Sequence, residues 1–326
     1  MSAEHPPLVS IVLPTYNRAN VLAGAVESVL KQSYPHFELI IVDDNSPDNT
    51  TEVVQSFNDK RIKYIKNETN LKLPGALNRG FAEAQGELLT WTSDDNFYFE
   101  QAIEEMVSAL RDSPYDLVYA DYYEFETMDE VTSQPKDPKL VRLPDSLTLE
   151  KGNQVGACFL YTRKAYETVG DYDTGLFLVE DYDYWIRISA LFKAKHIDKA
   201  LYYFRRDDNT LYCSRFCEIK ASDLLIRYKN RLLNQVQVID ALNALILNNV
   251  ERLKNPLLKG IYKIIKKTSY RLTRFYLKWL KAYFGSRLKN KVADILDAYD
   301  KKQKTYIETK DALKDYISRF AQIEYQ

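Results

Sequence analysis

Hydrophobic and polar positions follow two different periods along the first half of the chain. Short apolar runs rich in β-branched residues predict buried strands. The segments between them repeat apolar residues every three or four positions, which is typical of amphipathic helices. The predicted strands are residues 9–14, 37–42, 61–65, 87–91 and 116–119. The predicted helices are residues 19–32, 49–57, 73–85 and 99–110. Ser46 followed by Pro47 predicts an N-cap for the second helix.

This order of elements predicts the fold class. Strands that alternate with helices of about 10–15 residues form βαβ units, and these build a doubly wound, mainly parallel sheet. We therefore expect an α/β domain over residues 1–210, followed by a helical and basic C-terminal region over residues 211–326.

Two of the predicted strands end in adjacent carboxylates, Asp43-Asp44 and Asp94-Asp95. The carboxyl ends of neighbouring parallel strands converge on one crevice, where ligands bind. Paired carboxylates supply the hard oxygen ligands that Mg²⁺ and Mn²⁺ prefer, and such an ion commonly accompanies a phosphate. For Asp94-Asp95, a solvated turn with local hydrogen bonds is the alternative.

The glycine-rich phosphate loops of other nucleotide-binding folds are missing. No G-x-G-x-x-G follows the first strand, and no G-x-x-x-x-G-K-[ST] occurs in the sequence. This argues against the usual dinucleotide and P-loop sites. A metal-bridged diphosphate would need no such loop.

Three segments together resemble the inverting family-2 glycosyltransferases. They are Val-Ser-Ile-Val-Leu-Pro-Thr-Tyr-Asn-Arg at 9–18, Ile-Val-Asp-Asp-Asn-Ser at 41–46 and Ser-Asp-Asp-Asn at 93–96. The resemblance covers residues 8–205. It implies the GT-A fold and a nucleotide-diphospho-sugar donor, most often a UDP-sugar, used with a divalent cation.

The resemblance also implies roles for donor-binding residues. Pro14, Thr15 and Tyr16 would line the base pocket, Asp44 would accept a hydrogen bond from the base, Asp94 would contact the ribose or sugar, and Asp95 would ligate Mn²⁺ or Mg²⁺.

The sequence departs from the family pattern around the donor. Asn78 remains at a donor-binding position, but Leu77 stands where many relatives have Arg, so Lys72 or Arg79 is the expected substitute. Thr92 replaces the first Asp of the longer Asp-x-Asp-Asp form.

A second acidic cluster opens a predicted helix that continues through Leu191. Asp181, Trp185 and Ile188 share one face of this helix. The resemblance implies that Asp181 is the general base, with Glu180 as the second choice and Asp183 as a solvated helix residue. The alternative is an ordinary acidic N-terminus, which the helix dipole favours whatever the function.

The segment 200–210 resembles the family's Tyr-Arg-x-His element. Arg205 fits the Arg and would contact the diphosphate, whereas Asp207 stands where His is common. A surface salt-bridge cluster is the alternative.

Composition limits the classes of partner. The 326 residues, 45% of them hydrophobic, can bury one large core and a smaller appendage. The net charge of −1 argues against nucleic acid. The three Cys and three His do not have zinc-site spacing. The sparse Cys and the lack of a signal peptide or an 18-residue apolar run lead us to expect a cytoplasmic protein.

The near-zero net charge conceals a basic segment. Residues 252–293 contain thirteen Lys or Arg and no Asp or Glu, with Trp, Tyr, Ile and Leu at helical spacing. Such a segment predicts peripheral contact with the anionic inner face of the plasma membrane. The alternative is that it packs on the catalytic domain or on a second subunit of a homo-oligomer.

The expected function is metal-dependent, inverting transfer of a sugar from a nucleotide-diphospho-sugar to a hydroxyl of a saccharide or lipid-linked acceptor, in cell-surface polysaccharide or glycoconjugate synthesis. A nucleotide-sugar-binding protein without transferase activity is the main alternative. A nucleotidyltransferase is the other, and the missing glycine-rich loop argues against it.

Overall fold

The structure is a computed structural model that describes residues 5–129, 134–207, 215–248 and 291–320. The chain divides into two compact units, Met1–Asp207 and Asp208–Gln326. The predicted boundary after residue 210 falls outside the described residues and stays a prediction.

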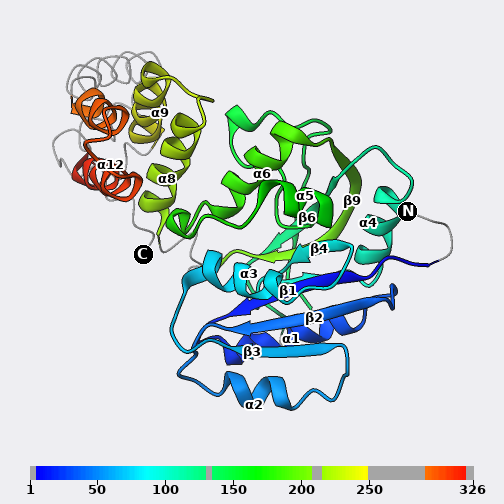
Figure 1. Ribbon diagram of the computed structural model, residues 1–326. Coiled ribbons are helices and arrows are strands. Elements are labelled where there is room, and N and C mark those ends of the chain that lie inside the picture. The colour runs from blue at the N-terminus through cyan, green and yellow to red at the C-terminus, as the bar shows by residue number, and fades with distance from the viewer. Residues whose placement is uncertain (1–4, 130–133, 208–214, 249–290, 321–326) are drawn as a thin grey trace, which may run out of the picture. The chain divides into compact units, whose positions relative to one another are not determined.

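The first unit is built on one nine-stranded sheet with the order β3-β2-β1-β4-β8-β6-β9-β5, and β7 pairs with β6 (Figure 1). The strands are β1 Val9–Thr15, β2 Phe37–Asp43, β3 Ile62–Lys66, β4 Leu88–Trp91, β5 Phe97–Tyr98, β6 Leu117–Phe125, β7 Lys139–Val141, β8 Phe159–Thr162 and β9 Ala194–Arg205. Strands β1 to β4 are mutually parallel, and β9 is parallel to β6. The antiparallel strand β8 joins these two groups.

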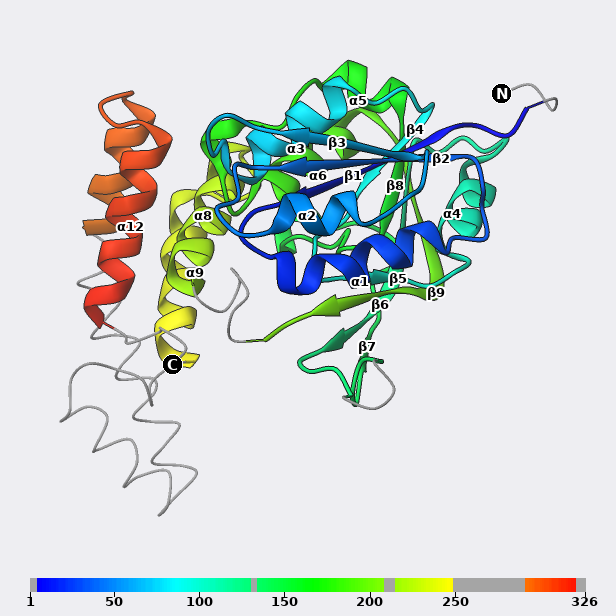
Figure 2. The same cartoon turned by 90° about the horizontal axis from the view of Figure 1, so that it is seen from below.

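Helices cover both faces of this sheet (Figure 2). They are α1 Ala19–Leu30, α2 Thr50–Gln55, α3 Lys72–Ala82, α4 Ala102–Leu110, α5 Arg163–Val169 and α6 Glu180–Leu191, with short 3₁₀ turns η1 Leu149–Lys151 and η2 Thr174–Leu176. Successive strand residues point to opposite faces. Ile11 accordingly packs in one core with α1 and α4, and Val12 packs in the other with α3 and α6. The predicted α/β fold is confirmed.

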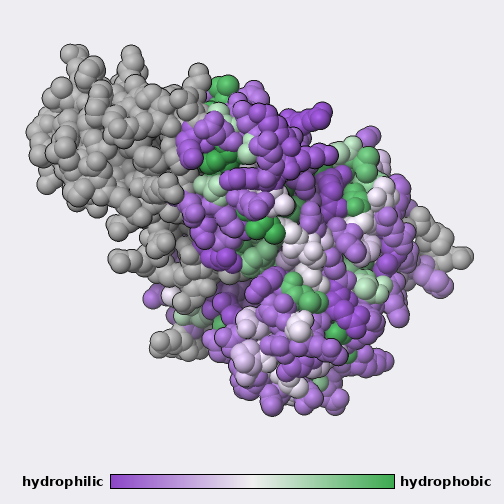
Figure 3. Space-filling view, turned by 60° about the vertical axis from the view of Figure 1, so that its left-hand side comes forward, coloured by the Kyte–Doolittle hydropathy of each residue, from purple (hydrophilic) through white to green (hydrophobic). Residues whose placement is uncertain are grey.

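Close packing sets how α3 lies on the sheet. A Cβ at Gly80 would lie 2.4 Å from Cγ1 of Val12, so only glycine lets the helix approach β1 this closely. The surface in Figure 3 is mostly hydrophilic, with hydrophobic side chains in small groups, as expected when the apolar faces are buried.

Two local predictions are wrong. The predicted helix 99–110 begins only at Ala102, because Phe97 and Tyr98 pair with β9 as the short strand β5. The N-cap position of α2 is held by Asn49 rather than Ser46. The Ser46 hydroxyl instead accepts a hydrogen bond from the backbone N–H of Asn17 at 3.0 Å, which joins the turns after β2 and β1.

The second unit is helical where it is described. Its helices include α8 Phe216–Lys229, α9 Gln235–Asn248 and α12 Tyr306–Phe320. Lys310 of α12 donates to the buried carboxylate of Glu218 on α8 at 3.0 Å. Among the described residues, no helix has the length and hydropathy needed to cross a membrane. Residues 252–290 of the basic segment lie outside this part of the chain.

Candidate active site

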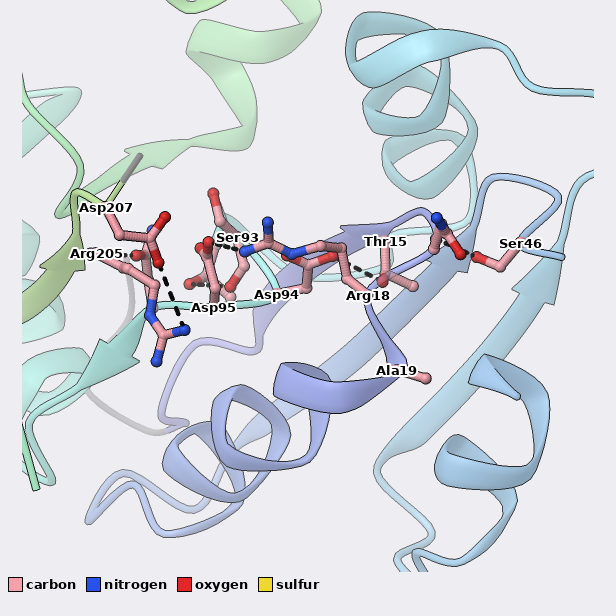
Figure 4. Close-up of polar contacts among 12 residues, drawn as sticks. Thr15, Arg18, Ala19, Ser46, Ser93, Asp94, Asp95, Arg205 and Asp207 are labelled. Atoms are coloured by element: carbon pink, nitrogen blue, oxygen red, sulfur yellow. Dashed lines mark hydrogen bonds and ion pairs between the residues drawn. The ribbon is translucent and has the colours of Figure 1, made fainter. Parts of the chain in front are cut away.

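The end of β1 and the turns after β1 and β4 bring four polar side chains together. The two strands are parallel neighbours with Val12 opposite Trp91, so continuing this register brings Thr15 level with Asp94. The Thr15 hydroxyl donates to Oδ2 of Asp94 at 2.7 Å. The Arg18 guanidinium donates to Oδ2 of Asp95, and its Nε lies 3.7 Å from Oδ1 of Asp94 (Figure 4).

The two carboxylates are buried, so the alternative of a solvated turn is wrong. Asp94 is 9% exposed and Asp95 8%. Burial and the adjacent charge of Asp95 raise the pKa of Asp94 to about 7. Burial also raises the pKa of Asp95, against the opposing effect of Arg18 and Arg205. Two carboxylates held this close in a desolvated site strongly favour a cation beside them.

Arg205 approaches the same pair from the end of β9 (Figure 4). Its backbone N–H donates to Oδ1 of Asn96 at 2.8 Å, which ties β9 to the Asp94-Asp95 turn. The guanidinium lies over the ring of Phe125 and 3.9 Å from Asp207. The Arg205 side chain is only 14% exposed, so a surface salt bridge does not describe it.

The Asp43-Asp44 pair at the end of β2 organises the neighbouring loops. Oδ1 of Asp44 accepts from the side-chain amide of Asn67 at 2.9 Å and from the backbone N–H of Leu71 at 2.8 Å. Asp43 accepts from the Tyr64 hydroxyl and the Ser46 backbone, both at 2.7 Å. Asp44 therefore holds the loop before α3 at the same sheet edge.

The predicted base-pocket residues differ in exposure. Pro14 and Thr15 are buried in β1, whereas Tyr16 is 48% exposed. The Tyr16 ring is thus available for stacking on a planar ligand. The predicted base-binding roles of these residues and of Asp44 stay predictions.

Asn78 and its neighbours on α3 are engaged within the protein. The Asn78 amide donates to the backbone O of Tyr172 and accepts from its N–H, both at 2.8 Å. Leu77 is fully buried in the core. Arg79 pairs with Glu83 at 2.9 Å and Lys72 is exposed. That one of them substitutes for the family's Arg stays a prediction.

Asp181 lies in the first turn of α6, where its two carboxylate oxygens accept hydrogen bonds. Oδ2 accepts from the Asn153 side chain at 2.8 Å and Oδ1 from the Tyr182 backbone at 2.7 Å. Burial raises the pKa of Asp181 to about 6. Burial and the neighbouring Asp181 charge raise that of Glu180 to about 8. A carboxyl group with a pKa near neutrality is suited to general-base work, although an ordinary acidic helix start stays open.

The prediction of a solvated Asp183 is wrong. This residue is buried and accepts from Nε of Arg187 at 2.8 Å. It follows Asp181 by two positions, so it points away from the face that Asp181 shares with Trp185.

Aromatic contacts connect α6 to the end of β4. The Trp91 indole donates to the Tyr172 hydroxyl at 3.1 Å, and the Tyr172 ring stacks on Tyr184 with centroids 4.0 Å apart. Phe159 lies edge-on to both Trp91 and Trp185. Trp91 is three residues before Asp94, so this packing fixes the helix that carries Asp181 against the strand that leads to the carboxylate pair.

Arg18 and Asn153 are functional candidates that sequence reasoning missed. Arg18 ends the motif at 9–18, and its place just after a strand end was the available signal. Asn153 lies 28 residues before Asp181, and no local pattern in the sequence links the two.

Comparisons with known proteins bear on the family and the fold. Residues 10–170 match the family model of Glycosyl transferase family 2. An uncharacterized glycosyltransferase of Rickettsia felis is 34% identical over 197 residues, which are 56% of this chain but only 31% of that relative. The matched region thus spans about a third of that protein's length.

Solved structures show the same fold. The mannosyltransferase PcManGT from Pyrobaculum calidifontis, in complex with GDP-Man and Mn²⁺, has a TM-score of 0.57 at 15% identity, covering 88% of each chain. S. aureus TarS 1-349 in complex with UDP-GlcNAc has a TM-score of 0.51 at 16% identity, covering 90% of this chain and 92% of that one. The predicted GT-A fold is confirmed, and residues 10–170 of the chain belong to glycosyl transferase family 2.

Proposed function

We propose that this protein is a metal-dependent, inverting glycosyltransferase that moves a sugar from a nucleotide-diphospho-sugar, by preference a UDP-sugar, to a hydroxyl of a saccharide or lipid-linked acceptor. The observation that carries the proposal is the buried Asp94-Asp95 pair at the carboxyl edge of the sheet, with Thr15, Arg18 and Arg205 around it. This is where an open α/β sheet binds its ligand.

The carboxylate oxygens of this site suit a divalent cation that also binds a diphosphate. Within the described residues, no three His, Cys, Asp or Glu side chains form a closed metal site. Mg²⁺ and Mn²⁺ sites of this kind use one or two carboxylates and take their other ligands from phosphate and water. Asp95, supported by Asp94, would hold the cation, which supplies stabilisation of the negative charge on the departing diphosphate.

The protein's own residues supply positioning and proton transfer. Tyr16 and Asp44 would hold the base, and Arg205 would contact the diphosphate. Asp181 accepts the proton of the acceptor hydroxyl while that oxygen attacks the anomeric carbon from the face opposite the diphosphate. The C–O bond to the diphosphate breaks as the new glycosidic bond forms, so a single displacement inverts the anomeric centre.

Nucleotide binding and sugar transfer test this proposal in turn. We expect UDP to bind in calorimetric titration only with Mn²⁺ or Mg²⁺ present, with GDP as the comparison nucleotide. UDP release from UDP-sugars in the presence of acceptor saccharides then tests transfer. Donor binding without release across a broad acceptor panel would instead favour the nucleotide-sugar-binding alternative, to which the buried Leu77 at the family's Arg position lends some support.

We also propose a location for the enzyme, on the cytoplasmic face of the plasma membrane. The thirteen Lys or Arg of residues 252–293, unopposed by any Asp or Glu, support it, because each basic residue near an anionic surface contributes about 1 kcal/mol. The full chain should sediment with vesicles containing phosphatidylserine and not with vesicles of phosphatidylcholine alone. Equal sedimentation with both would contradict this location and leave packing on protein as the role of the segment.

A further inference from the structure

We propose that Arg18 competes with the divalent cation for Asp94 and Asp95, so that the cation binds tightly only together with a diphosphate that accepts the displaced guanidinium. This inference rests on the proposed function, because it takes Asp95 as the metal ligand. It assigns to Arg18 the coupling of metal binding to donor binding.

The contacts of Arg18 place it where a cation would bind. Its Nη2 contacts Oδ2 of Asp95, and its Nε lies 3.7 Å from Oδ1 of Asp94, so one guanidinium spans both carboxylates. Figure 4 shows the side chain extended toward the pair. These are the oxygens that the proposed metal requires.

The side chain can leave without disturbing the fold. The backbone of Arg18 is fixed, since its carbonyl O accepts from the N–H groups of Val21 and Leu22 in the first turn of α1. The side chain is 27% exposed, and its Nε is buried without a hydrogen-bond partner. Among the described residues, the ion pairs that the head group loses when it swings outward are those with Asp94 and Asp95.

Repulsion between positive charges requires Arg18 to leave the carboxylates when the cation binds. With Arg18 on the carboxylates and Arg205 nearby, a divalent cation would add a third positive group to a small, desolvated region. Like charges in such a region repel strongly. A diphosphate relieves this repulsion and offers several oxygens to the released guanidinium, which binds phosphate in a bidentate manner.

The consequence is a reciprocal coupling between the two ligands. If Arg18 must leave before the cation binds, diphosphate raises the cation's affinity, and the cation raises the nucleotide's affinity by the same factor. Coupling of this kind typically amounts to about 5–150-fold. Removal of Arg18 should reduce it.

The test measures Mn²⁺ binding directly, by electron paramagnetic resonance of free Mn²⁺, with and without UDP. For Arg18→Gln we expect Mn²⁺ alone to bind at least ~10-fold more tightly than to the wild type, and UDP to improve that affinity less. Arg61→Gln is the matched control. Arg61 is also 27% exposed and pairs with an Asp, Asp59, at 2.7 Å. It lies just before β3, so its substitution should change neither affinity.

A second variant and a measurement of stability distinguish the proposed effect on Mn²⁺ binding from a folding defect. Arg18→Lys keeps a cation beside the carboxylates, so its affinity for Mn²⁺ alone should stay close to that of the wild type. Mn²⁺ alone should raise the melting temperature of Arg18→Gln and leave that of the wild type almost unchanged.

Two different failures can be told apart. If the wild type binds UDP with Mn²⁺, but Arg18→Gln binds Mn²⁺ alone no better than the wild type, the competition is wrong while the proposed function stands. If the wild type binds no UDP under any metal condition, the proposed function itself fails.

Discussion

At the scale of single residues, the surroundings of Asp181, the proposed base, suit it to proton transfer. It lies in the first turn of α6, where two donors fix its carboxylate and burial moves its pKa toward neutrality. The neighbouring Glu180 is more fully buried, and its carboxylate accepts a hydrogen bond from the backbone N–H of Leu178 at 2.7 Å. Of the two acids, Asp181 is the more exposed, and it is the one that we propose as the base.

Replacement of Asp181 by Asn should therefore separate chemistry from binding. We expect Asp181→Asn to lower kcat by about 10²–10⁴-fold, because the amide cannot accept the proton. Its affinity for UDP with Mn²⁺ should be unchanged. Asp112→Asn, which alters an exposed carboxylate elsewhere in the domain, is the control and should retain full activity. Transfer at the normal rate by Asp181→Asn would show that another group is the base.

At the scale of elements, the segment between β7 and β8 supports the start of α6. Asn153 donates to Asp181 and accepts from the backbone N–H of Val155 at 3.2 Å, so its amide is held in place. The Tyr182 hydroxyl donates to the backbone O of Leu149 in η1. These contacts join a loop with no recognisable motif to the helix that carries the proposed base.

The loss of this support should appear in the pH dependence of transfer. The hydrogen bond from Asn153 lowers the pKa of Asp181, which burial otherwise raises. In Asn153→Ala that pKa should rise further, so the acid limb of the kcat profile should shift to higher pH, because the base must be deprotonated to act.

The adjacent Gln154 provides the control for this measurement. Its side chain accepts from the backbone N–H of Thr148 at 2.5 Å and stabilises the same loop from within. Gln154→Ala should keep the wild-type profile. Superimposable profiles for Asn153→Ala and Gln154→Ala would mean that Asn153 does not position Asp181.

At the scale of the whole molecule, the sequence predicts well what is periodic or adjacent in the chain. The alternating apolar runs predict the strands and helices of the α/β domain, and adjacency predicts the Asp94-Asp95 pair at a strand end. The pairing of Phe97 with Tyr203 across the sheet depends on tertiary contacts, which is why the short strand β5 was missed.

The same limit explains the incomplete prediction of the site. The local sequence around Asp183 predicts a solvated helix residue. In the folded chain, Asp183 is buried and pairs with Arg187. Arg18 reaches Asp95 across 77 positions of sequence, and Asn153 reaches Asp181 across 28. Contacts between residues this far apart in the sequence produce no local pattern, so they can be identified only in the folded structure.

The proposed function depends first on the binding of a divalent cation and a nucleoside diphosphate together at Asp94 and Asp95. The most direct measurement is calorimetric titration of UDP into the full chain with and without Mn²⁺, repeated with Asp95→Asn. We predict binding by the wild type with Mn²⁺, little or none after the metal is chelated, and loss of the metal-dependent component in Asp95→Asn. UDP binding that is equally tight without metal, or unchanged in Asp95→Asn, would contradict the claim.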